Sequence, residues 1–185
     1  PGKLPATIRS RCRGLTLQPL QGADIDGLLA RRAPALSDID RRVLTRLAEG
    51  SIGRALDLAG EGGLELHGEL MGLVGGLPDL DVGHLHRFAE KMSRQGGETT
   101  FRAAGDLLRW WLSHLIAAAA GRQPAVQEAA ERALFARIAG PGNLDRWLEV
   151  WEKVNHLLAR TDAVNLDRRQ VMLTAMLAVR DAARP

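Results

Sequence analysis

The residues best suited to chemistry lie near the start of the chain, at positions 7–13, Thr-Ile-Arg-Ser-Arg-Cys-Arg. This stretch contains three arginines, the only cysteine of the chain and no acid. Because Arg9, Arg11 and Arg13 occupy every second position, an extended backbone would place them on one face, about 7 Å apart. Guanidinium groups bind phosphate or carboxylate in a bidentate manner. The pattern therefore predicts an anion site, although from charge alone a solvated loop is the commoner explanation.

The basic character of the chain is confined to this end. Residues 1–20 contain Lys3 and the three arginines without any acid, and the whole chain has a net charge of +3, so the remaining residues sum to −1. A protein that binds nucleic acid along its whole surface normally shows a basic stripe on its helices. The charge distribution does not favour that kind of protein.

Composition sets the class and the compartment. The 185 residues are 45% hydrophobic and 25% charged, which suits one sizeable core or two small domains. The single Cys12 rules out an internal disulfide and fits a reducing compartment, so we expect a cytoplasmic protein. No apolar run is long enough for a membrane span, and the start lacks the apolar core of a signal peptide. The chain begins at Pro1 and not at methionine, so we expect it to be a fragment of a longer protein.

Hydrophobic periodicity divides the chain into three parts. Residues 1–20 predict loop, a short strand around 14–17 and loop, with the partner strands of that strand expected upstream. From Asp24 the period becomes helical, and three short helices are expected before Gly60. Ser37 is suited to cap the second, and the Gly50-Ser51 pair is suited to join the second to the third. The glycines at 60, 62 and 63 predict a domain boundary, giving the ranges 1–20, 21–62 and 63–185.

The last range predicts six amphipathic helices joined by short connections, an all-α bundle. Asn165 is the expected cap of the last helix. The helix over 98–120 has a seam typical of helix packing, and Leu107, Trp110 and Ile116 lie off that seam, which predicts a second apolar face for association with other chains. The six expected ranges are 64–74, 81–93, 98–120, 124–138, 144–158 and 167–179.

Other candidate chemistry is sparse. His84 and His86 point in different directions on a helix and have no further ligand at metal-site spacing, so no metal is expected. Cys12 has no neighbouring histidine that could activate it as a nucleophile. No phosphate loop of the GxxxxGK[ST] form occurs. The four tryptophans, at positions 110, 111, 147 and 151, could stack bases. Core or interface positions are favoured instead, because Trp147 and Trp151 are aligned with leucines.

Two ordered motifs resemble those of AAA+ clamp-loader subunits. Residues 3–13, with the leucines at 15, 17 and 20 and Pro19, resemble the region of the Ser-Arg-Cys motif of that family, here Ser10-Arg11-Cys12. Residues 47–56, Leu-Ala-Glu-Gly-Ser-Ile-Gly-Arg-Ala-Leu, are similar to its sensor 2 helix. The resemblance implies a short extended remnant of the AAA+ core at 1–20, a three-helix lid at 21–62 and a helical collar for oligomerisation at 63–185.

The sensor 2 region departs from the pattern of ATP-binding subunits at one position. Those subunits place an arginine directly after Gly-Ser-hydrophobic, whereas this chain has Gly53 there and Arg54 one residue later, about 100° away around the helix. This resembles the delta prime type of subunit in bacterial DNA polymerase III, which supplies an arginine finger to ATP on a neighbouring subunit. By this resemblance Arg11 is the finger, with Ser10 and Cys12 framing it.

The resemblance further implies a role in DNA replication with no cofactor bound by this chain itself. The expected partners are the delta and gamma/tau subunits, with DNA and the sliding clamp reached through the assembled complex. The chain itself is not expected to catalyse a reaction, although it would belong to the polymerase holoenzyme and its clamp-loader ATPase. Two alternatives stay open: an ATP-binding gamma/tau-type subunit, and a stand-alone helical module that binds nucleic acid through its arginine row, with steep salt dependence.

Overall fold

The computed structural model describes residues 5, 7, 10–12, 17–60, 62–122, 129–140, 142–163 and 165–184. Within these ranges every regular element is a helix and no strand occurs, which confirms the all-α prediction. Most of the strand expected around 14–17 lies outside the described residues, and Leu17 has no regular structure. The start of the helix expected from 124 likewise lies outside them, as do Arg9 and Arg13.

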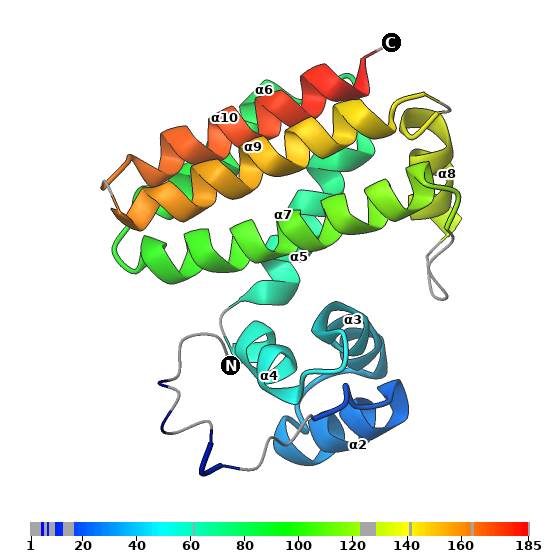
Figure 1. Cartoon of the computed structure of the whole chain (residues 1–185), viewed down its shortest axis with the longest axis vertical. Coiled ribbons are helices and arrows are strands. Elements are labelled where there is room, and N and C mark those ends of the chain that lie inside the picture. The colour runs from blue at the N-terminus through cyan, green and yellow to red at the C-terminus, as the bar shows by residue number, and fades with distance from the viewer. Residues whose placement is uncertain are drawn as a thin grey trace.

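Three short helices form the first group, at the lower end of the molecule in Figure 1. They are α2 (Gly22–Arg32), α3 (Asp38–Ala48) and α4 (Ile52–Gly60), and each contacts the other two. Ser37 caps α3 as predicted, because its Oγ accepts a hydrogen bond from Asp40 N at 3.1 Å. The apolar faces of α2 and α3 meet in the interior, where Ile25, Leu29 and Leu44 are 0% exposed.

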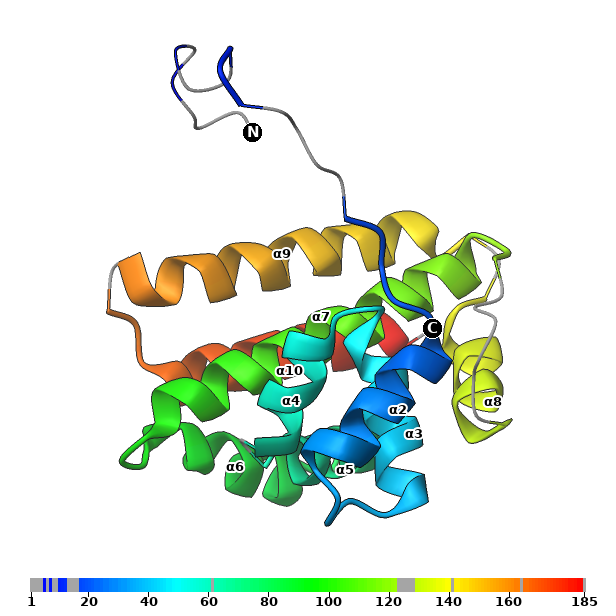
Figure 2. The same ribbon diagram turned by 90° about the horizontal axis from the view of Figure 1, so that it is seen from below.

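The remaining helices form a bundle above the first group (Figure 1). Helix α5 (Gly63–Gly75) follows α4 closely and leads from the first group into the bundle. Helices α7, α9 and α10 run alongside one another, and α9 is the outermost of the three in Figure 2. The other elements are α6 (Val82–Glu90), the 3-10 turn η1 (Lys91–Ser93), α7 (Gly97–Ala119), α8 (Ala129–Ile138), α9 (Leu144–Ala163) and α10 (Arg168–Ala183).

Helix α7 is the centre of the bundle and contacts α5, α8, α9 and α10. The second apolar face expected on it is therefore covered within the chain: Leu107 is 1% exposed and Trp110 is 3% exposed, while Ile116 is half-buried. The prediction that these residues form a free face for other chains is wrong for Leu107 and Trp110. A wide apolar surface indicates that a helix packs against several neighbours. For α7 those neighbours are helices of the same chain.

The tryptophans pack in or against the core, which is one of the two positions, core or interface, that the sequence predicts for them. Trp111 and Trp147 are 0% exposed, and Trp147 Nε1 donates a hydrogen bond to Ile138 O at 3.2 Å. Trp151 is half-buried against the same core. Three of the four indoles thus have no surface on which a nucleic-acid base could stack.

One predicted cap is wrong. Helix α10 begins at Arg168, and its N-cap is Asp167, whose Oδ1 accepts a hydrogen bond from Gln170 N at 3.1 Å. Asn165 lies two residues further from the helix with φ +49°, a left-handed conformation that asparagine tolerates well. The carboxylate next to the first helical residue reaches the unpaired N–H groups, and Asn165 is too far away to do so.

The two groups of helices share one buried core that extends from Ile25 to Ala182. Helices α3 and α4 both contact α5, so α5 connects the first group of helices to the bundle. Among the helices that the structure describes, none combines the length and apolarity needed to cross a bilayer.

Candidate functional site

The predicted finger segment is an exposed turn. Ser10 and Arg11 lie in a turn and Cys12 in a bend, and all three residues are exposed. The Ser10 Oγ donates a hydrogen bond to Thr7 O at 3.1 Å. The extended backbone expected here is therefore wrong for residues 10–12, because a serine hydroxyl that bonds the carbonyl three residues earlier favours a turn.

Arg11 has no hydrogen-bond or ion-pair partner within the part of the chain that the structure describes. Cys12 beside it is a free, exposed thiol. An arginine that acts on a group held by another molecule must be exposed and uncommitted, and Arg11 meets both conditions.

The chain that follows this segment is fixed to the joint between α3 and α4. Leu20 N donates a hydrogen bond to Gly50 O at 3.0 Å. Gly50 has φ +86°, and a Cβ added there would lie 2.4 Å from Pro19 Cβ, so this position requires glycine for its conformation and for the close approach of Pro19. The contact brings Pro19 and Leu20, at the end of the first motif region, next to Gly50 within the second motif.

The first turn of α4 carries the position at which the motif departs from ATP-binding subunits. Ser51 Oγ accepts a hydrogen bond from Arg54 N at 3.3 Å, as expected for the cap of α4. Gly53 is exposed, and a Cβ there would meet only Ser51 Oγ, at 3.9 Å. A side chain could therefore fit at position 53, but the glycine provides none to the first turn of α4.

Arg54 does not replace the missing side chain. Its Nη1 forms an ion pair with Glu49 Oε2 at 3.3 Å, so the guanidinium is directed to the residue that precedes the α3–α4 joint. Glu49 itself is left-handed, with φ +47°, at the C-terminal end of α3. Position 53 thus carries no side chain, and the Arg54 guanidinium is directed to Glu49.

A second cluster, which sequence reasoning missed, joins the first group of helices to the bundle. Arg46 on α3 forms an ion pair with Glu131 on α8, with 3.0 Å between Nη1 and Oε2. Both side chains are largely buried, at 12% and 7% exposure. The Arg46 guanidinium also lies over the ring of Trp110 on α7, 5.2 Å from its centroid. Arg46 and Glu131 are 85 residues apart in sequence, so no local sequence pattern predicts their contact.

Beside this cluster lies a cavity of about 250 Å³, bounded by α5, α7 and α8. His67 and Trp111 line it, together with Arg137, whose Nη2 donates to Gly75 O at 3.1 Å and to Leu77 O at 2.8 Å. The two hydrogen bonds satisfy carbonyls at the C-terminal end of α5 and fix α8 against it. The cluster and the cavity thus define how α3, α5 and α8 meet.

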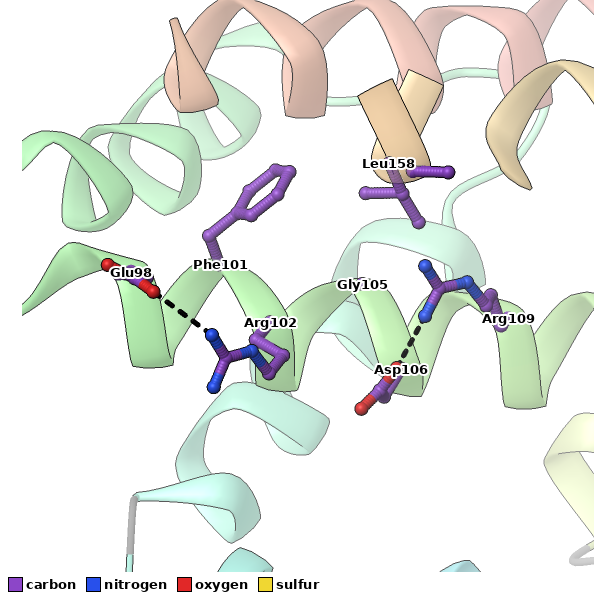
Figure 3. Close-up of a pocket in the computed structure, with 8 residues that line it drawn as sticks. Glu98, Phe101, Arg102, Gly105, Asp106, Arg109 and Leu158 are labelled. Carbon is purple, nitrogen blue, oxygen red and sulfur yellow. Dashed lines mark hydrogen bonds and ion pairs between the residues drawn. The ribbon is translucent and has the colours of Figure 1, made fainter. Parts of the chain in front are cut away.

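A groove of about 320 Å³ lies between α7 and α9 (Figure 3). Its charges are paired: Arg102 Nη2 lies 3.0 Å from Glu98 Oε1, and Arg109 forms an ion pair with Asp106. A Cβ at Gly105 would lie 3.2 Å from Leu158 Cδ2, so the groove floor is a close helix contact. The groove holds no nucleophile with a neighbouring base, and we assign no chemistry to it.

The five histidines are spread over α5, α6, α7 and α9. Within the described ranges, no three His, Cys, Asp or Glu side chains lie close enough together to hold a metal ion. His114 Nδ1 lies 2.8 Å from Trp110 O on the same helix, and His67 packs edge-on against Trp110 with 6.3 Å between ring centroids. Both histidines therefore serve packing around Trp110.

No protein-family model, curated protein or solved structure matches this chain. Membership of the clamp-loader family therefore stays a prediction from the two sequence motifs.

Proposed function

We propose that this chain is an accessory subunit of a DNA clamp loader, of the delta prime type, that does not hydrolyse ATP itself. In this proposal Arg11 is an arginine finger for ATP held by a neighbouring gamma/tau-type subunit, with Ser10 and Cys12 shaping the turn around it. The helices from α5 to α10 would form the collar through which the subunit joins delta and gamma/tau. DNA and the sliding clamp would be reached only through the assembled complex.

The observation that carries the proposal is the contrast between the two motif arginines. Arg11 is exposed and without a described partner, whereas Arg54 is held by Glu49 and leaves the sensor position to Gly53. A subunit that binds and senses its own ATP needs the second arginine. A subunit that acts only on a neighbour's ATP needs the first.

The chemistry of a finger in trans is well defined. Phosphoryl transfer spreads negative charge over the transferring group, and an arginine supplied by a neighbouring protein stabilises that charge, by about 10³ to 10⁵ in rate for nucleotide hydrolases. Hydrolysis then depends on assembly, because the ATP and the finger lie on different chains. A fully charged guanidinium with five N–H donors suits this role better than a lysine.

The test is the ATPase activity of the reconstituted complex, stimulated by primed DNA and the sliding clamp. Arg11→Ala should leave the complex assembled in gel filtration and reduce turnover at the site that Arg11 faces by at least about 10²-fold, and Arg11→Lys should restore little of it. Arg31→Ala is a matched control, because Arg31 is also exposed but lies on α2. Unchanged turnover in Arg11→Ala would remove Arg11 from catalysis.

DNA binding by the chain alone separates this proposal from a nucleic-acid-binding module. The clamp-loader proposal expects weak binding of duplex or primed DNA by the isolated chain. Tight binding that falls steeply with salt and is lost in Arg11→Ala would favour the module instead.

A further inference from the structure

The cavity of about 250 Å³ between α5, α7 and α8 carries an excess of positive charge. Two arginines, Arg46 and Arg137, line it, and the one acid among its lining residues, Glu131, is already paired with Arg46. The groove between α7 and α9 has two bases and two acids, and so does a hollow between α9 and α10. The charge excess therefore distinguishes this cavity from those two and favours an anion in it.

Arg137 is the cation that a bound anion would meet. Its Nη2 donates to Gly75 O at 3.1 Å and to Leu77 O at 2.8 Å, which holds the guanidinium at the cavity. Its Nη1 and Nε donate to no group among the described residues. Because the guanidinium is already held in place, little conformational entropy is lost when these N–H groups bind an acceptor.

The remaining wall of the cavity is largely apolar and includes a residue with a buried hydrogen-bond donor. Val74 and Leu134, 0% and 8% exposed, lie in the wall together with the half-buried Met71. Trp111 also lines the cavity and is 0% exposed, and its indole Nε1 has no acceptor among the described residues. Buried N–H groups nearly always have a partner, so this donor is consistent with an acceptor supplied by a bound molecule.

We propose that this cavity binds a small organic monoanion, a carboxylate attached to a compact apolar body such as an aromatic ring. The carboxylate accepts hydrogen bonds from Arg137, and the apolar body packs against Val74 and Leu134. A dianion such as phosphate is disfavoured, because Glu131 lies in the same cavity and the apolar wall offers a second charge no solvation.

The volume of the cavity limits the ligand. About 250 Å³ lies just below the range of about 300–1,000 Å³ that is usual for sites of drug-sized ligands, so the ligand is smaller than those. Benzoate, with about nine non-hydrogen atoms, is a suitable probe, and a Kd of about 1 mM is within reach of a ligand of that size. A ligand in this place contacts α5, α7 and α8 together, so its binding should also stabilise the fold.

Titration of the whole chain with sodium benzoate, followed by NMR at constant ionic strength, tests this proposal. The indole N–H resonance of Trp111, identified by its loss in Trp111→Phe, should shift in a saturable manner with a Kd of about 1 mM or below. Benzamide has the same shape without the charge, and acetate has the charge without the ring. Each should bind at least about tenfold more weakly than benzoate.

Two alanines of α8 provide a matched pair of variants. Ala133 lines the cavity and Ala136 does not, and both are exposed. Ala133→Glu places a negative charge at the cavity and should weaken benzoate binding at least about tenfold, whereas Ala136→Glu should leave it unchanged. Arg137→Gln removes the positive charge and should weaken binding to a similar extent. Circular dichroism establishes that each variant is folded.

Three results would overturn the proposal. They are the absence of a saturable shift up to about 10 mM benzoate, which is tenfold above the expected Kd, benzamide binding as tight as that of benzoate, and equal effects of the two glutamate variants. Because Ala136→Glu adds the same charge to the same helix, a general effect of charge cannot mimic the expected difference. The titration involves no clamp-loader component, so it succeeds or fails independently of the proposed function.

Discussion

Arg11 and Arg46 show two opposite uses of the same side chain. Arg11 lies on an exposed turn and has no described partner, whereas Arg46 is 12% exposed, paired with Glu131 and stacked on Trp110. The buried arginine fixes the first group of helices against the bundle. The exposed one contributes nothing to the fold that the structure shows and remains available to another molecule. Burial and pairing, and not residue type, therefore separate structural arginines from candidate functional ones.

The largest expected effect comes from breaking the buried pair. Glu131→Ala leaves the Arg46 guanidinium without its carboxylate in a site with little solvent, which should lower the free energy of unfolding by about 3–5 kcal/mol. Urea unfolding followed by circular dichroism measures it. Arg11→Ala removes an exposed side chain and should change the free energy of unfolding by no more than about 0.5 kcal/mol. Equal effects of the two substitutions would contradict the distinction between them.

The buried pair can be tested further by replacing it. Arg46→Met combined with Glu131→Leu removes both charges together and fills much of the same volume, so it should recover most of the stability that Glu131→Ala loses. A double variant as unstable as Glu131→Ala would mean that Arg46 stabilises the fold through Trp110 more than through the ion pair.

Two glycines of the α3–α4 joint give the next largest effect, with opposite signs. Gly50→Ala places a side chain at φ +86° and 2.4 Å from Pro19 Cβ, and should lower the free energy of unfolding by about 1–3 kcal/mol. Gly53→Ala lies in the open first turn of α4 and should raise it by up to about 1 kcal/mol. Both are measured by urea unfolding. A neutral Gly50→Ala would contradict the close packing of Pro19 against this joint.

The helix plan could be predicted from the sequence because its signals are local. Ser37, Ser51 and the apolar periods of α2, α3 and α7 place helices where the structure has them. What covers an apolar face is not local information, which is why the sequence predicts Trp110 at an interface and the structure buries it within the chain.

The residues of the candidate site could be predicted from the sequence, but the contacts that surround them could not. Ser10, Arg11 and Gly53 stand out from motifs in the sequence. The hydrogen bond from Leu20 to Gly50 joins residues 30 positions apart, and the pairing of Arg46 with Glu131 spans 85 positions. Both contacts depend on how the helices pack together, and periodicity does not specify that packing.

A third cation, Lys91, lies between the two arginines in exposure, at 27%, and gives the smallest effect. Its Nζ donates to Glu65 Oε1 at 2.7 Å and to Glu69 Oε1 at 2.8 Å, which ties η1 to α5. Hydrogen bonding to Glu65 and then Glu69 raises the pKa of Lys91, and hydrogen bonding from Lys91 lowers the pKa of Glu65.

The sign of the pH dependence follows from these directions. The contribution of Glu65 is present above the ordinary glutamate pKa of 4.5 and is lost as the pH falls through its lowered pKa. The contribution of Lys91 is present below the ordinary lysine pKa of 10.5 and is lost as the pH rises through its raised pKa. Lys91→Gln should therefore reduce the urea midpoint slightly at neutral pH and have less effect well below the ordinary glutamate pKa of 4.5. A pH-independent difference would show that Lys91 acts through packing alone.

Single-turnover hydrolysis in the assembled clamp loader is the decisive test of the proposal that Arg11 acts on a nucleotide bound by another chain. With ATP prebound, Arg11→Ala should slow the hydrolysis step at the site that Arg11 faces by at least about 10²-fold and leave ATP affinity unchanged, because the finger stabilises charge that develops only in the transition state. A hydrolysis rate equal to that of the wild-type complex would contradict the claim.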